Sequence, residues 1–139
     1  MGWRETWRAT VESFLREVRA AEASDQPDPV VAAIAVARAE LAGVDRELRT
    51  VAERHAHERA AAELCARRQE MADRIGDRET AEVAQRFRRR HEERAVLLRR
   101  KEAVLLDERT LAIAALEELL DYARVDATAV EEAPPTGDR

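Results

Sequence analysis

Histidine and cysteine are the residues of this chain whose chemistry could hold a metal ion or supply a nucleophile. His55 and His57 lie two residues apart, and on a helix this spacing points them to different faces, so they do not chelate one ion together. Cys65 is the single cysteine, which excludes an intrachain disulfide and a thiolate cluster. The sequence contains no glycine-rich phosphate loop, nucleophile elbow or zinc-protease motif. We therefore expect no enzymatic activity, no metal site and no cofactor.

Arginines concentrated between residues 86 and 101 could bind phosphate or lipid headgroups, because guanidinium groups match the geometry of phosphate oxygens. Glu92 and Glu93 interrupt this basic run. Three further acidic residues could face it from an earlier helix: Glu53, Glu58 and Glu63. We favour a solvent-exposed, salt-bridged surface, with an anion-binding patch as the alternative.

Residues 1–23 have the pattern of an amphipathic helix that seeks a membrane surface. Six apolar residues fall within an arc of about 120° on a helical wheel: Trp3, Trp7, Val11, Phe14, Leu15 and Val18. Arg4 and Arg8 lie beside this arc. Indole rings favour the headgroup region and arginine favours anionic lipid, so these eight residues are the predicted membrane-binding set. Packing on the rest of the chain or on a protein partner requires the same pattern, and a leader with neither role is a third interpretation.

The composition predicts an all-α protein. Charged residues make up 38% of the 139 residues and aromatic residues 4%, and the common residues alanine, leucine, arginine and glutamate all favour helix. We predict a linker at 24–28, a helical hairpin at 29–124 with its tip near 75–78, and a disordered acidic tail at 125–139. The net charge of −5 argues against a nucleic-acid partner. No stretch approaches 18 apolar residues, so no span of a bilayer is expected.

The hairpin prediction depends on apolar residues that recur with a period of 3.5, which is typical of a coiled coil. Folding the chain at Gly76 brings together residues whose numbers add up to about 153. The resulting seam pairs are Ile34 with Leu119, Leu41 with Ala112 and Leu48 with Leu105. The same rule places Glu63 near Arg90 and Glu53 near Arg100. An uninterrupted helix that dimerises is the alternative to this antiparallel coiled coil.

In these features the chain resembles the family of phage shock protein A and the vesicle-inducing protein in plastids, which are relatives of the ESCRT-III membrane remodellers. The opening Met1-Gly2-Trp3, amphipathic to Ala20, resembles the leading membrane helix of that family. Asp28-Pro29-Val30 is similar to its linker into the hairpin. The segments similar to its hairpin tip are Ala62-Glu63-Leu64, Ala66, Ala72, Gly76-Asp77, Ala81-Glu82-Val83-Ala84 and His91-Glu92-Glu93-Arg94.

The resemblance implies a non-enzymatic peripheral membrane protein that acts in envelope-stress response or membrane maintenance. It implies a cytoplasmic location at the inner face of the cell membrane, an anionic membrane surface as partner, and self-association through the hairpin. The alternative is a soluble coiled-coil adaptor that binds a protein, for example an AAA-type transcription activator, in place of lipid. The predicted hairpin ends near Arg124, whereas family members continue into further helices, so assembly into rods or rings is in doubt.

Overall fold

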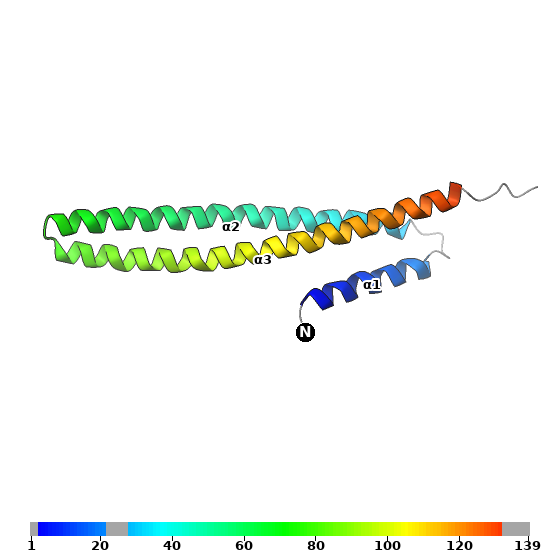
Figure 1. Cartoon of the computed structure of the whole chain (residues 1–139), viewed down its shortest axis with the longest axis horizontal. Coiled ribbons are helices and arrows are strands. Elements are labelled where there is room, and N and C mark those ends of the chain that lie inside the picture. The colour runs from blue at the N-terminus through cyan, green and yellow to red at the C-terminus, as the bar shows by residue number, and fades with distance from the viewer. Residues whose placement is uncertain (1–2, 22–27, 132–139) are drawn as a thin grey trace, which may run out of the picture. The chain divides into compact units, whose positions relative to one another are not determined.

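The computed structural model of this chain is all-α in the residues that it describes, 3–21 and 28–131 (Figure 1). Its helices are α1 (Trp3–Ala21), α2 (Pro29–Arg74) and α3 (Arg78–Glu131). In α1, side chains are described for residues 8–17. The prediction of an all-α protein is confirmed. In the described ranges, no helix is both long enough and apolar enough to cross a bilayer.

The chain forms two compact units, and α2 and α3 contribute to both. One unit contains residues 1–42 and 110–139, and the other contains residues 43–109. In the second unit, the segments of α2 and α3 lie side by side and run in opposite directions from the turn that joins them (Figure 1).

Helix α2 begins at Pro29, the residue at which the predicted hairpin begins. The side-chain Oδ1 of Asp28 accepts a hydrogen bond from the amide of Val30 at 3.0 Å, and the Asp28 carbonyl accepts from the amide of Ala32 at 3.3 Å. Pro29 occupies the first helical position, where a missing N–H leaves no bond unmade. The predicted linker before Asp28 lies largely outside the described residues.

The turn between α2 and α3 is a Schellman motif followed at once by a new N-cap. Gly76 has a φ of 75°, in the left-handed region. The Asp77 amide donates to the Ala72 carbonyl at 2.9 Å, and the Gly76 amide donates to the Asp73 carbonyl at 3.2 Å. The Asp77 carboxylate then accepts from the Thr80 amide at 3.1 Å. Hydrogen bonds from the side chain and backbone of Thr80 hold the pKa of Asp77 below its usual value. Gly76 is thus the left-handed residue that ends α2, and Asp77 is the N-cap of α3.

Replacing each of two glycines by alanine should change stability in opposite directions. A Cβ at Gly76 meets no atom within 4 Å, so Gly76→Ala pays only for a left-handed backbone, and should lower the free energy of unfolding by about 1–2 kcal/mol. Gly43 lies inside α2 and a Cβ there meets only Arg46 Nη2 at 3.8 Å, so Gly43→Ala should raise stability by roughly 0.5–1 kcal/mol. Urea unfolding followed by circular dichroism measures both. Equal signs for the two variants would contradict this assignment of the turn.

Small side chains dominate the seam between α2 and α3 in residues 43–109. Val51 is the most deeply buried, at 2% exposure, and Leu105 follows at 3%. The other buried hydrophobic residues of this unit are Cys65, Ala72, Ala81, Ala84 and Ala95. Because most of these are alanines, the two large residues supply a disproportionate share of the buried apolar surface.

Helix α3 continues to Glu131, so the prediction that residues 125–139 form a disordered tail is wrong for residues 125–131. The reason is local, because no glycine or proline occurs between Arg124 and Pro134, and Ala127 and Ala129 favour helix. The rest of the predicted tail lies outside the described residues.

Candidate functional site

Part of the predicted membrane-binding face can be followed in the side chains of α1. Val11, Phe14 and Leu15 are half-buried, while Arg8 is exposed. The spacing of three and four residues places the apolar side chains on one face of the helix. The side chains of the other members of the set lie outside the described residues: Trp3, Arg4, Trp7 and Val18.

The half-buried face of α1 packs against its own chain. Phe14 and Leu15 contact a small core formed by Ala33, Ala37 and Leu119, against which Ile34 and Leu116 also pack. This placement corresponds to the second sequence interpretation, in which the helix docks on the rest of the chain. It does not conflict with lipid binding, but lipid binding by the same face would require α1 to leave this core.

The packing of α1 on this core is incomplete. A cleft of about 130 Å³ remains between the helices, lined among others by Val11, Phe14, Val36 and Ala115. Val36 is 56% exposed although it borders the cleft. Two of the three buried residues under α1 are alanines, which offer little apolar area. The docked contact is therefore a weak one by the standard of a packed core.

The predicted seam residues all lie in the shielded part of their helices. Leu105, Ala112 and Leu119 are buried, and Ile34, Leu41 and Leu48 are half-buried. Ile34 packs against the core that contains Leu119, which is its predicted partner. The other two pairings stay predictions.

A polar pair occupies the same seam and was not predicted from the sequence. His91 Nδ1 lies 2.6 Å from Glu58 Oε2, and the two side chains are only 22% and 17% exposed. The guanidinium of Arg94 lies 4.0 Å from the other oxygen of Glu58. The sequence does place Glu58 in the seam, because it is seven residues from both Val51 and Cys65 and so falls on the 3.5-residue period.

The surroundings of Glu58 favour its charged form. The hydrogen bond from His91 holds the pKa of the Glu58 carboxyl below its usual value, and the charges of His91, Arg94 and His57 act in the same direction. Partial desolvation opposes these effects without cancelling them.

This pKa shift predicts a stability loss in acid. Since the folded-state pKa of Glu58 is lowered, its contribution is fully present above the unfolded-state value and disappears as pH falls through the folded-state value. Glu58→Gln should therefore lower the free energy of unfolding by about 1 kcal/mol at neutral pH and by progressively less below about pH 4. Urea unfolding at several pH values measures this difference. Glu53→Gln, an exposed residue on the same helix, is the control, and an equal loss in that variant would contradict the role of the pair.

The remaining ion pairs between α2 and α3 differ from the predicted ones. Arg109 Nε lies 2.7 Å from Asp45 Oδ1, and Lys101 Nζ lies 2.8 Å from Glu47 Oε1. The predicted pairs of Glu63 with Arg90 and of Glu53 with Arg100 do not form among the described residues. Arg90 instead lies over the ring of Phe87, 5.7 Å from its centroid. Exposed pairs contribute little, so this difference leaves the seam itself intact.

Neither the cysteine nor the histidines form a site for a bound ion in the described ranges. Cys65 is buried and unpaired, and a buried free cysteine packs as a small apolar residue. The described residues include no cluster of three or more His, Cys, Asp or Glu side chains that could hold a metal.

Comparison of the chain with models of protein families, with curated proteins and with solved structures finds no match in any of the three. The resemblance to the phage shock protein A family is therefore an expectation from the sequence alone.

Proposed function

We propose that this chain is a non-enzymatic, peripheral membrane-binding protein, in which α1 binds anionic bilayers and α2 and α3 form an antiparallel coiled-coil hairpin. The observation that carries this proposal is the incompletely covered apolar face of α1, with Val11, Phe14 and Leu15 on one side of the helix and the exposed Arg8 beside them. Such a helix can lie in the interface with its apolar face in the acyl region and its arginines at the phosphates. A role in envelope-stress response or membrane maintenance, at the cytoplasmic face of the membrane, follows if the sequence resemblance holds.

The energetic basis of the proposal is a competition between two environments for the same face of α1. On its own chain, α1 is held through Phe14 and Leu15 against a core rich in alanine. In a bilayer the whole predicted stripe, including both tryptophans, would be removed from water. Each large apolar side chain contributes roughly 1.5–3 kcal/mol when fully buried. For the described side chains, a bilayer would cover more of this face than the alanine-rich core does, and anionic lipid would add attraction for the arginines.

Tryptophan emission tests this proposal, because both indoles of the chain lie in α1. On addition of vesicles of phosphatidylglycerol and phosphatidylcholine at low salt, the emission maximum should move to the blue and the protein should sediment with the vesicles. Vesicles of phosphatidylcholine alone should give much weaker binding, since the electrostatic attraction is lost. Wild-type protein that stays in the supernatant at low salt would rule the proposal out.

A soluble coiled-coil adaptor is the second candidate, and the docking of Phe14 and Leu15 on the chain's own core favours it. In that case α1 belongs to the folded body and a protein, for example an AAA-type activator, binds elsewhere on the hairpin. This function predicts an emission maximum that is already blue without lipid and that does not respond to the lipid composition.

Self-association is also part of the proposal. Several large apolar side chains on α3 are more than half exposed in the single chain: Val96, Leu97 and Val104. Exposed apolar residues of this kind are often covered by a partner. Light scattering over a range of protein concentrations would measure the oligomeric state, and a monomer at all concentrations would remove this part.

A further inference from the structure

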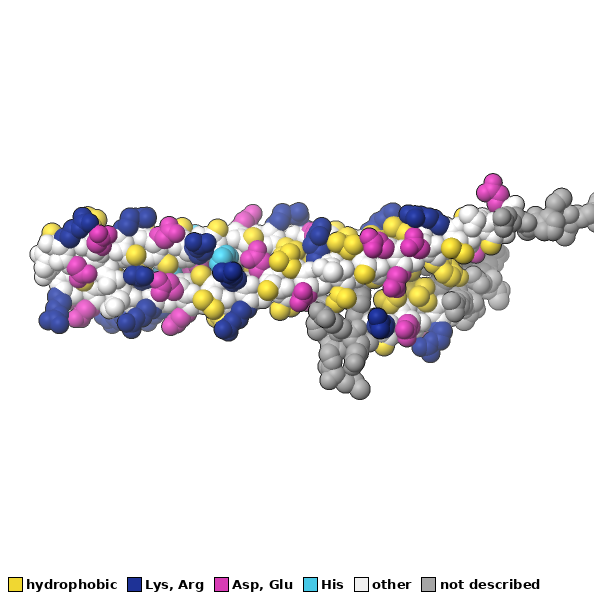
Figure 2. Space-filling model, viewed as in Figure 1, with side chains coloured by type: hydrophobic (Ala, Val, Ile, Leu, Met, Phe, Trp, Pro, Cys, Tyr) yellow, Lys and Arg dark blue, Asp and Glu magenta, His cyan; other side chains and the backbone are white. Residues whose placement is uncertain are grey.

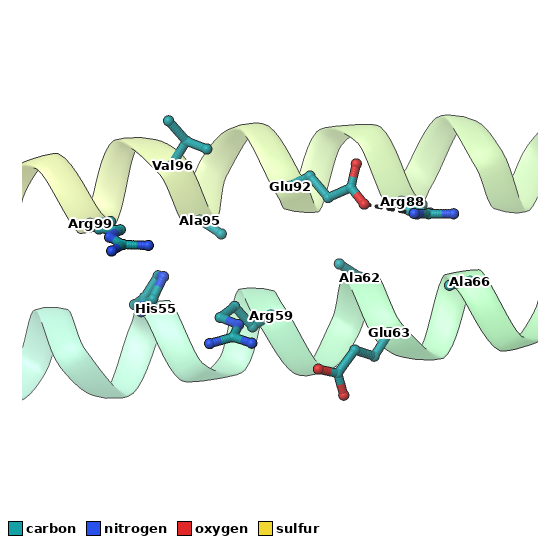
Figure 3. A pocket seen from close by; sticks show the side chains of 10 residues that line it. All are labelled: His55, Arg59, Ala62, Glu63, Ala66, Arg88, Glu92, Ala95, Val96 and Arg99. Atoms are coloured by element: carbon teal, nitrogen blue, oxygen red, sulfur yellow. Dashed lines mark hydrogen bonds and ion pairs between the residues drawn. The ribbon is translucent and has the colours of Figure 1, made fainter.

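A groove of about 370 Å³ follows the seam of residues 43–109, between the middle turns of α2 and α3 (Figure 3). Three of the residues that line it are alanines, Ala62, Ala66 and Ala95. A coiled-coil seam normally closes because large side chains meet there, and these alanines leave the space unfilled. The groove therefore has room for a group the size of a phosphate.

Cationic side chains surround one end of this groove. His55 and Arg59 reach it from α2, and Arg99 reaches it from α3. Figure 3 shows the side chains of His55 and Arg99 extending toward one another across the space between the helices. Among the described residues, neither Arg59 nor Arg99 forms an ion pair, so both guanidinium groups keep their donors for another acceptor.

The acidic residues of the groove do not neutralise this end. The Glu92 carboxylate is paired with Arg88, with Nε and Oε1 2.8 Å apart. Glu63 also lines the groove, but its carboxylate points away from α3 (Figure 3). Glu58, which lies one helical turn from His55 in α2, is already bonded to His91.

The surrounding segment has a surplus of positive charge. Residues 86–101 contain eight Lys and Arg against two Glu. The whole unit 43–109 contains 17 Lys and Arg against 15 Asp and Glu, a formal net charge of +2, although the chain as a whole carries −5. The sequence favoured a salt-bridged surface in which Glu53, Glu58 and Glu63 face the basic run. Of these three acids, only Glu58 pairs across the seam among the described residues, so this surface forms only in part. Figure 2 shows Lys and Arg side chains exposed along both helices toward the turn.

We propose that this groove binds a phosphate group, with Arg59 and Arg99 as the principal donors and the His55 ring as a third. Guanidinium groups donate two parallel hydrogen bonds to phosphate oxygens, and such charge-assisted bonds are about twice as strong as neutral ones. The small alanine side chains that line the groove leave room for the phosphate between the helices, where it neutralises cationic side chains of both α2 and α3. The groove lies in residues 43–109 and uses no residue of α1, so this inference is independent of the proposed function of that helix.

Isothermal titration of the full chain tests the groove, with inorganic phosphate and glycerol 3-phosphate as probes and sodium chloride at matched ionic strength as the blank. We expect dissociation constants on the order of 1 mM, and a loss of at least about tenfold in the double variant Arg59→Gln with Arg99→Gln. The control is Arg89→Gln with Arg100→Gln, which removes the same charge from exposed positions outside the groove. Circular dichroism should show the same helix content in all three proteins.

A second arm separates a soluble phosphate from a lipid phosphate. Sedimentation with vesicles that contain phosphatidic acid, whose headgroup is a phosphate monoester, is compared for the same three full-length proteins, each also carrying Trp3→Glu and Trp7→Glu to weaken lipid binding by α1. Loss of either phosphate or vesicle binding in the groove variant alone supports the site and identifies the source of the group. Wild-type protein that binds neither probe, or a control pair that loses as much as the groove pair, would overturn the proposal.

Discussion

Leu105→Ala is expected to lower the free energy of unfolding by about 3 kcal/mol, which is the largest effect of a single substitution anticipated for the seam between α2 and α3. Leu105 is 3% exposed and lies in a seam whose other members are mostly alanines. Neighbouring alanines cannot move far enough to refill the volume of a lost isobutyl group, so both transfer energy and cavity energy are lost. A melting temperature lower by about 10 °C should accompany the change in a chain of this length.

Leu97→Ala is the matched control, because the same groups are removed from a leucine of the same helix that is 61% exposed. We expect a change within about 0.5 kcal/mol for this variant, as for other surface substitutions. Thermal unfolding followed by circular dichroism at 222 nm measures both proteins. Similar losses at the two leucines would show that the chain associates through the outer face of α3, and would place the apolar core elsewhere than in the seam.

Replacing both tryptophans by glutamate should reduce the affinity for anionic vesicles at least about 100-fold, because apolar burial is lost and two negative charges meet a negative surface. Trp3 and Trp7 belong to the predicted apolar arc of α1, together with the half-buried Val11. Arg4 and Arg8 remain in the variant, so electrostatic attraction alone is left to hold the helix. Sedimentation over a range of lipid concentrations measures the loss.

The control for this double variant is Thr6→Glu with Ser13→Glu, which adds the same charge on the polar side of the helical wheel. We expect a loss of no more than about tenfold there, from electrostatic repulsion alone. Equal losses in both double variants would mean that charge, and not the apolar arc, determines binding. That result would favour the soluble adaptor, in which Phe14 and Leu15 hold α1 permanently on its own chain.

The two experiments address different units and so can fail separately. Leu105 lies in the unit of residues 43–109, whereas α1 and its core lie in the unit of residues 1–42 and 110–139. A stable seam with no lipid binding would leave a coiled-coil adaptor. If the protein binds lipid but Leu105→Ala leaves its stability unchanged, the apolar face of α3 must pack against something other than α2.

Local sequence determined where α2 and α3 begin and how α2 ends. Asp28 and Asp77 supply side-chain acceptors to the first amides of a helix, and Gly76 adopts a left-handed φ at low cost. These effects act over fewer than six residues, so they need no knowledge of the rest of the fold. The alanine-rich composition likewise predicts helix everywhere, and it was the absence of a breaker before Pro134 that carried α3 beyond its predicted end.

Only the tertiary structure decided which side chains meet. The packing of Phe14 and Leu15 on Ala33, Ala37 and Leu119 depends on where α1 docks, and many docking positions suit one amphipathic face. The pairing of Glu58 with His91, 33 residues apart, and the groove beside Arg59 and Arg99 depend on the register of two helices. The periodicity of each helix identifies its seam face. Alanines at successive turns, however, are compatible with several registers of the two helices. In each of these registers the long charged side chains beside the seam can reach more than one partner.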